Sequence, residues 1–293
     1  MRLIPSFPPL LLVLFLVHTI PSLGLSQAKS DPAIRATLEN AYNAWRSAMD
    51  SQDLKRWEQA TALSRQIDIR NRIVSQKLPF PQALFEDPIG APPLGGLFAL
   101  GVLSTGETAT STYFGKANFG EAPGAAITDN MIVLHFLKEE GSWRFDTLRV
   151  VKMGADSGIL LQIRNRDYSF LQSAEFQPAP QLPPLPQPVE TPDFVAEAWI
   201  DATGYELTLT VNGIKTGTFP NMKGAELLIG GLKKGQNQVT ITSRHLPEAQ
   251  AGAGRVEVAI YAARDASGKA SRVFHYLPGA DVLPSVSETF VVE

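Results

Sequence analysis

Cysteine is absent from this 293-residue sequence. Its absence excludes disulfide bonds, thiolate zinc sites, iron–sulfur clusters and a cysteine nucleophile. Positive charge is not in excess either, because 26 Lys and Arg stand against 29 Asp and Glu. Non-specific nucleic-acid binding requires a surplus of basic residues to neutralise phosphates. We therefore expect no nucleic-acid partner.

Long hydrophobic runs are also missing, apart from one short run near the N-terminus. Residues 10–17 are apolar and follow Arg2, but the run is shorter than the roughly 20 residues that a membrane-spanning helix needs. Small residues follow, with Ser26 and Ala28 among those suited to a signal-peptidase site. We predict that residues 1–28 are a signal peptide and that the protein is exported. If this segment stays uncleaved, we expect the protein to contact the membrane through it.

Glycosylation acceptors of the Asn-x-Ser/Thr type are absent as well. An exported protein that has neither cysteine nor such acceptors fits a bacterial envelope better than an animal extracellular space. The expected localisation is therefore periplasmic or secreted, in a bacterium.

Histidine is scarce, and the common ligand-binding motifs fail. Of four His, His18 lies in the predicted signal peptide, and the others are not at metal-ligand spacing. The glycines at 230 and 235 have the spacing of a phosphate loop, but Gln236 follows where a Lys is required. No Gly-x-Ser-x-Gly motif occurs. We therefore expect no metal and no other cofactor, and these motifs identify no catalytic residue.

Apolar residues make up 44% of the chain, enough to bury a sizeable core, and the prolines mark its organisation. Residues 177–192 are rich in proline, which is typical of an extended linker. This linker predicts an N-terminal α+β domain, residues 29–176, and a C-terminal all-β domain, residues 193–293.

The sequence of the N-terminal domain predicts helices followed by strands. A helix capped by Asp31, with Pro32 in its first turn, carries an apolar stripe at helical spacing, and two further helical stretches follow up to residue 74. Strand-like runs then occur at 97–103, 108–114, 131–138 and 143–151. The last two flank Glu139-Glu140-Gly141-Ser142, which favours a hairpin.

These elements resemble a known family. A helix bearing Tyr42 and Trp45, a break at 50–53, a short second helix and the run VLHFLKEEGSWRFDTLRVV are similar to the NTF2-like proteins. That group includes SnoaL-type and ketosteroid-isomerase-like members. The resemblance implies an α+β fold in which three helices pack on a curved antiparallel sheet that forms a cone.

The resemblance also implies a pocket, because family enzymes place an Asp or His base inside an apolar cavity. Our pocket candidates are His135, Asp146, Arg149, Trp45 and Trp57. His135 with Asp146 or Arg149 could form a polar pair in an apolar wall. Two plainer interpretations stay open: His135 makes a structural hydrogen bond or faces solvent, and the two Trp residues belong to the core.

The C-terminal domain predicts an Ig-like or fibronectin-like β-sandwich. Residues 205–211 alternate apolar and polar side chains, and Asn212-Gly213 supplies the pair of positive φ angles of a type I′ turn. Several further short strands follow at regular spacing. Without the disulfide of antibody domains, we expect Trp199 to fill the core.

Three functions are compatible with these sequence features. The first is a non-enzymatic exported binding or assembly module, whose partner is a small molecule or an envelope protein. The second is a small-molecule lyase or isomerase acting in the cone pocket. The third is carbohydrate or peptide binding through the β-sandwich.

Overall fold

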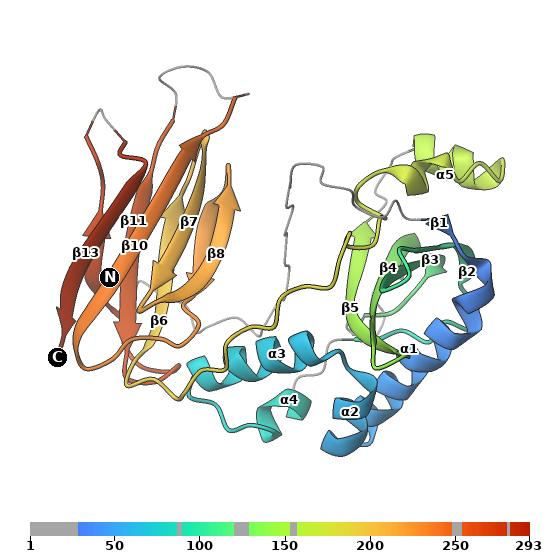
Figure 1. Ribbon diagram of the computed structural model, residues 1–293, viewed down its shortest axis with the longest axis horizontal. Helices are drawn as coiled ribbons and strands as arrows, with labels where there is room; N and C mark the ends of the chain where they lie inside the picture. The colour runs from blue at the N-terminus through green and yellow to red at the C-terminus, as the bar shows by residue number, and fades with distance from the viewer. Residues whose placement is uncertain (1–28, 87–89, 120–128, 153–156, 248–253, 280–281) are drawn as a thin grey trace. The chain divides into compact units, whose positions relative to one another are not determined.

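The computed structural model describes residues 29–86, 90–119, 129–152, 157–247, 254–279 and 282–293 (Figure 1). The predicted signal peptide, residues 1–28, lies outside them. The described chain divides into two compact units. Residues 29–67 and 85–186 form what we call the sheet unit, and residues 68–84 and 187–293 form the sandwich unit.

The sheet unit contains one five-stranded antiparallel sheet, ordered β1-β2-β3-β4-β5. Strands that follow one another along the chain are neighbours in the sheet, although β1 lies far from β2 in sequence. The strands are β1 (Lys29–Ser30), β2 (Phe98–Ser104), β3 (Thr108–Lys116), β4 (Asp129–Glu139) and β5 (Ser142–Lys152). The predicted hairpin is confirmed: Glu139 pairs with Ser142, and Glu140 and Gly141 both have positive φ.

Helices α1 (Arg35–Asp50) and α2 (Leu54–Ala60) cover one face of this sheet through an aromatic cluster. The ring centroids of Trp45 and Phe145 lie 4.4 Å apart, and Tyr42 is also stacked on Trp45. The expected cap is wrong: the Asp31 side chain accepts no capping hydrogen bond, and the chain first makes the 3₁₀ turn η1 (Pro32–Ile34). A side-chain cap is found on α2 instead, where Asp53 accepts from the backbone of Arg56.

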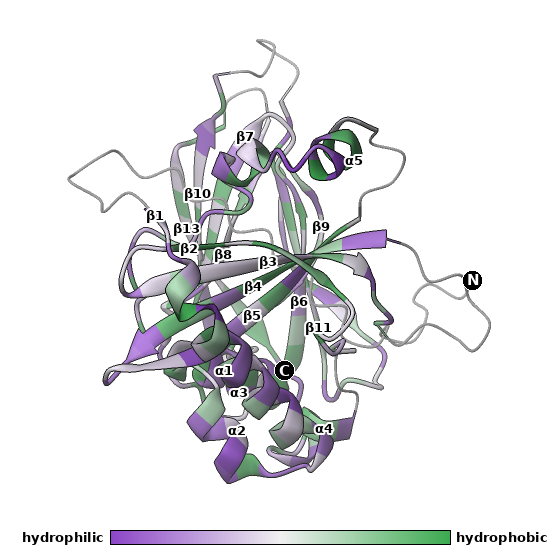
Figure 2. Ribbon diagram, turned by 90° about the vertical axis from the view of Figure 1, so that its right-hand side faces the viewer, coloured by the Kyte–Doolittle hydropathy of each residue, from purple (hydrophilic) through white to green (hydrophobic). Residues whose placement is uncertain are grey.

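The opposite face of the sheet is covered by α5 (Ser157–Arg164) and η2 (Ser169–Gln172), a region whose sequence shows no clear pattern. In Figure 2, α5 carries both hydrophilic and hydrophobic residues, as a helix lying on a sheet requires. The buried members of this second core are Leu100, Met131, Val133, Leu171 and Phe176.

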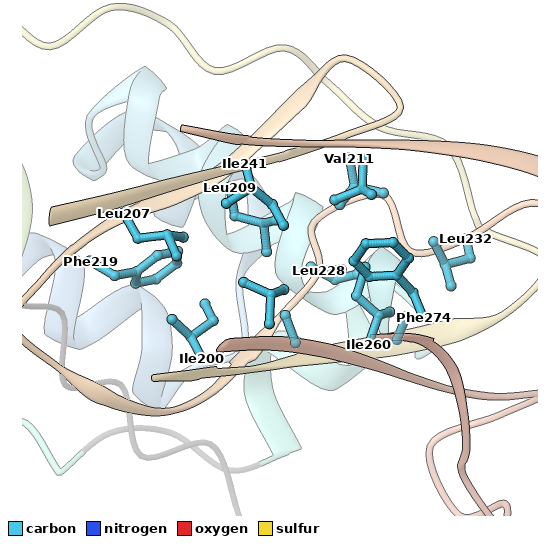
Figure 3. Close-up of a cluster of buried hydrophobic side chains, with 14 of the residues drawn as sticks. Ile200, Leu207, Leu209, Val211, Phe219, Leu228, Leu232, Ile241, Ile260 and Phe274 are labelled. Carbon is cyan, nitrogen blue, oxygen red and sulfur yellow. The ribbon is translucent and has the colours of Figure 1, made fainter. Parts of the chain in front are cut away.

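The sandwich unit contains two four-stranded sheets, ordered β13-β10-β7-β8 and β12-β11-β6-β9. Apolar side chains of the two sheets point toward one another and form one core, as Figure 3 shows for Leu209 and Ile260. The strands are β6 (Val195–Asp201), β7 (Tyr205–Val211), β8 (Ile214–Pro220), β9 (Lys223–Leu227), β10 (Gly235–His245), β11 (Glu257–Ala263), β12 (Ser271–Tyr276) and β13 (Ser285–Val292).

The hairpin between β7 and β8 confirms the turn expected at Asn212-Gly213. Val211 pairs with Ile214, and φ is 50° at Asn212 and 79° at Gly213. The Asn212 side chain adds a second role, since its oxygen accepts from the backbone of Gln238 on β10 at 3.0 Å. This residue therefore shapes the turn and ties it to the neighbouring strand.

Helix α3 (Leu63–Ser75) belongs to both units, and its part from Asp68 onward is fixed to the sandwich unit. The Asn71 side chain donates to the Gln187 carbonyl at 2.8 Å and accepts from the Val189 amide at 3.0 Å. The buried Ser75 hydroxyl accepts from the Gly230 amide at 2.8 Å. The following helix, α4 (Gln82–Glu86), also crosses the division.

The expected fold class is therefore wrong. We expected an α+β chain with an NTF2-like cone of three helices on one curved sheet, followed by a sandwich. Over the described residues the chain is mainly β, with one five-stranded and two four-stranded sheets and four helices of seven or more residues. The helices do not form the expected trio, because α3 uses Asn71 and Ser75 to anchor its second half in the sandwich unit.

Candidate functional site

His135 lies on the sheet face that α5 and η2 cover. It follows Met131 and Val133 at the two-residue spacing of a strand, so its side chain points to the same face as theirs. Its cross-strand neighbours are Thr110 and Thr147. Burial, and then two nearby guanidinium groups, lower the pKa of His135 to about 4. The imidazole is therefore neutral at neutral pH.

The two guanidinium groups near His135 are those of Arg149 and Arg65, and each contacts an acid. Nη2 of Arg149 lies 3.0 Å from the Glu175 carboxylate and also donates to the Glu175 carbonyl. Nε of Arg65 lies 3.4 Å from the Asp146 carboxylate and 3.0 Å from the Asp146 carbonyl. The charged candidates thus take part in ion pairs that hold chain segments together.

Trp45 and Trp57 lie with the helices on the opposite face of the sheet. Trp57 is 1% exposed, and Trp45 packs on Phe145 in the aromatic cluster. The structure therefore gathers His135, Asp146 and Arg149 on the β4–β5 pair and separates them from both Trp candidates.

A groove of about 500 Å³ opens elsewhere on the sheet unit, between α1, the segment before β2, and β3. This volume falls in the usual range for ligand sites. Its walls combine apolar side chains with one cation, one anion, an amide and a phenol. The lining residues are Arg35, Glu39, Asn43, Pro93, Leu94, Gly95, Leu97, Phe98, Ala99 and Tyr113.

The polar groups of this groove form a chain of contacts. The Tyr113 hydroxyl donates to Oε1 of Glu39 at 2.9 Å, and Nε of Arg35 lies 3.4 Å from the same oxygen. Burial raises the pKa of Tyr113, and the adjacent Glu39 carboxylate raises it further. The phenol therefore stays protonated and acts as a fixed donor.

The wall formed by the chain before β2 is held by α1. The Tyr42 hydroxyl donates to the Pro92 carbonyl at 2.9 Å, and Nε of Arg46 donates to the Ala91 carbonyl at 2.8 Å. Further along this wall, after Pro93 and Leu94, is Gly95, where an added Cβ would meet no atom within 4 Å. These bonds fix the start of this wall to α1, and a side chain added at Gly95 would begin in open space at the groove lining.

Sequence reasoning missed this groove, although one signal for it was present. Arg35, Glu39 and Asn43 recur at a spacing of four, which places them on one side of α1. Nothing in that spacing indicates which chain segment faces them.

The outer face of the sandwich unit carries a second notable residue. Trp199 does not fill the core, as we had expected: it is 37% exposed, and Nζ of Lys223 lies 5.9 Å from its ring centroid. Beside it Asp201 pairs with Lys223 at 3.1 Å. Burial favours the neutral acid, but hydrogen bonds from Thr203 and Lys223 outweigh it and lower the pKa of Asp201. These contacts stabilise the sheet surface.

Within the described ranges, no three His, Asp or Glu side chains gather in a way that could hold a metal ion. No helix in this part of the chain is both long and apolar enough to cross a membrane. Comparison with family models, curated proteins and solved structures found no match for this chain.

Proposed function

We propose that this chain is an exported, non-enzymatic binding module that holds its ligand in the groove between α1 and β3. The observation that carries this proposal is the groove, whose wall is fixed to α1 by Tyr42 and Arg46. A concave surface of mixed polar and apolar character, with a few oriented polar groups, is what ligand binding requires.

The chemistry of the groove supports binding rather than catalysis. Tyr113 keeps its proton because its pKa is raised, so it is a hydrogen-bond donor and a poor base. Glu39 contacts both Tyr113 and Arg35 through one oxygen, so its charge is already partly balanced. His135 lies elsewhere, on the sheet face that α5 and η2 cover.

The proposal is tested by filling the groove. Gly95→Leu places a side chain in open space at a position without positive φ, so the variant should fold like the parent. Small apolar molecules and short peptides are titrated by calorimetry into the parent, into Gly95→Leu, and into Gly279→Leu as a control on the other unit. We expect the Gly95 variant to lose at least about tenfold in affinity for ligands that the parent binds. Equal binding by all three proteins would place the binding site elsewhere.

Export is tested by expressing the full chain in a bacterium. We expect the protein in the periplasmic fraction or the medium, with an N-terminus near Lys29 in the mature form. An intact N-terminus in a cytosolic fraction would contradict export and leave the groove proposal unaffected.

A further inference from the structure

The β2 strand is only partly paired on the side where β1 lies. β1 pairs with β2 at two positions, Lys29 with Ser104 and Ser30 with Leu103. The Asp31 amide then donates to the Val102 carbonyl at 3.0 Å. Beyond that bond the chain enters η1, which still contacts β2, and along this edge β2 has no further paired strand within the described chain.

This open stretch of strand edge meets the groove. β2 continues from Gly101 back to Phe98, and Phe98 and Ala99 line the groove together with Leu97. Ala99 shares the face of Tyr113 and the groove, whereas the Phe98 side chain, 54% exposed, lies on the other face with its ring centroid 6.4 Å from that of Tyr168. Unpaired strand edges are templates for a further strand, and apolar recesses beside them give such a strand its sequence preference.

The charges of the groove are those that suit a peptide backbone. Among its lining residues only Arg35 and Glu39 are charged, and they are paired with each other. The terminal nitrogens of Arg35 and the second carboxylate oxygen of Glu39 have no partner among the described residues. The groove therefore offers a free donor from Arg35 next to a free acceptor from Glu39, and the pair carries no net charge. A peptide backbone complements both, because its carbonyl accepts from the donor and its amide N–H donates to the acceptor.

We infer that the groove binds an extended, uncharged and apolar peptide segment of another protein, which adds to the open edge of β2 in line with β1. The segment's backbone pairs with β2, and its side chains enter the recess formed by Pro93, Leu94 and Leu97. This inference rests on the proposed function, because it names the ligand of the same groove.

The test uses fluorescein-labelled pools of short capped peptides and measures binding by fluorescence anisotropy. One pool carries Val, Ile, Leu, Phe or Thr at each position, and the second is identical but N-methylated at alternate residues. N-methylation removes backbone donors and keeps the side chains, so we expect at least about tenfold weaker binding. Arg35→Gln and Glu39→Gln should each weaken the first pool roughly threefold to tenfold, whereas Arg56→Gln on α2 should not.

The outcomes separate this inference from the proposed function. Equal binding of the two pools, or no binding of either, would overturn strand addition. The groove would remain the binding site if the parent bound small molecules that Gly95→Leu did not. If Gly95→Leu bound both the first pool and the small molecules as tightly as the parent, both the inference and the proposed site would be wrong.

Discussion

The two units bury their apolar surface in different ways. The sandwich unit closes one core between two sheets, whose side chains meet as Leu209 and Ile260 do in Figure 3. The sheet unit has one sheet, with α1 and α2 on one face and α5 with η2 on the other. Its β1 strand is two residues long, so the edge of β2 is left open beside a groove. The proposed binding site thus lies where a strand partner ends early, away from the closed core of the sandwich unit.

The largest expected effect comes from the closed core itself. Leu209 is fully buried in the sandwich core, and Leu209→Ala should lower the free energy of unfolding of that unit by about 2–5 kcal/mol. We expect hydrogen exchange to accelerate in the strands β6 to β13 and to stay unchanged in β2 to β5. Val291→Ala, at a residue 64% exposed, is the control and should change stability by less than about 0.5 kcal/mol. Equal acceleration of hydrogen exchange in both units would contradict the claim that each unit has its own core.

The second prediction tests whether α3 is part of the sandwich unit. Asn71→Ala removes one donor and one acceptor and leaves the Val189 amide without its partner. We expect a loss of about 1–3 kcal/mol in the unfolding free energy of the sandwich unit. Asn40→Ala, at an exposed position of α1, provides the control. If hydrogen exchange changed only in the sheet unit, the assignment of α3 would be wrong.

The third prediction concerns the effect of acidic pH on the stability of the sheet unit. The pKa of His135 is lowered to about 4 in the folded protein, from an ordinary value of 6.5. Between pH 6.5 and about 4, the unfolded chain binds more protons at His135 than the folded chain does. The contribution of His135 to the free energy of unfolding is therefore fully present above pH 6.5 and decreases as the pH falls toward about 4. We expect a loss of roughly 1–3 kcal/mol over this range, measured by urea unfolding at several pH values.

His135→Gln should remove most of that pH dependence, whereas His245→Gln, at an exposed position of the sandwich unit, should keep it. A sheet unit whose stability does not change between neutral pH and a pH of about 4.5 would contradict the described surroundings of His135.

The smallest effect is expected at the β7–β8 turn. Gly213 has a φ of 79°, and an added Cβ there would meet no atom within 4 Å. Gly213→Val should therefore cost only the strain of the left-handed backbone conformation, about 1–2 kcal/mol, in the sandwich unit. Gly279→Val, at an open position without positive φ, should be close to neutral in the same thermal unfolding experiment. Equal melting of the two variants would contradict the turn's role in setting the register.

The sequence predicted well those features that depend on neighbouring residues. Asn212-Gly213 and Glu140-Gly141 adopt the positive φ angles that tight hairpins need, and both hairpins are present. The Ile159–Phe170 stretch escaped prediction because its apolar residues do not alternate regularly, and its helix, α5, is only eight residues long. Asp31 did not cap a helix, because a 3₁₀ turn begins at Pro32.

Features that depend on distant residues were not predictable. The periodicity of residues 63–74 indicated a helix, but only the bonds of Asn71 and Ser75 show which sheet system its second half joins. The groove likewise depends on where β1 ends, and no local pattern fixes that point. The spacing of Arg35 and Glu39 in the sequence placed them on one side of a helix, but it did not indicate which chain segment faces them.

The most direct test of the binding account is hydrogen exchange at the open edge of β2, measured with the apolar peptide pool present. We predict that amides of the Phe98–Gly101 stretch become protected when the peptides are added, and that the N-methylated pool gives no such protection. Amides of β10 and β13 in the sandwich unit should exchange at the same rate in all cases. Protection absent from Phe98–Gly101, or found equally in β13, would contradict strand addition at this groove.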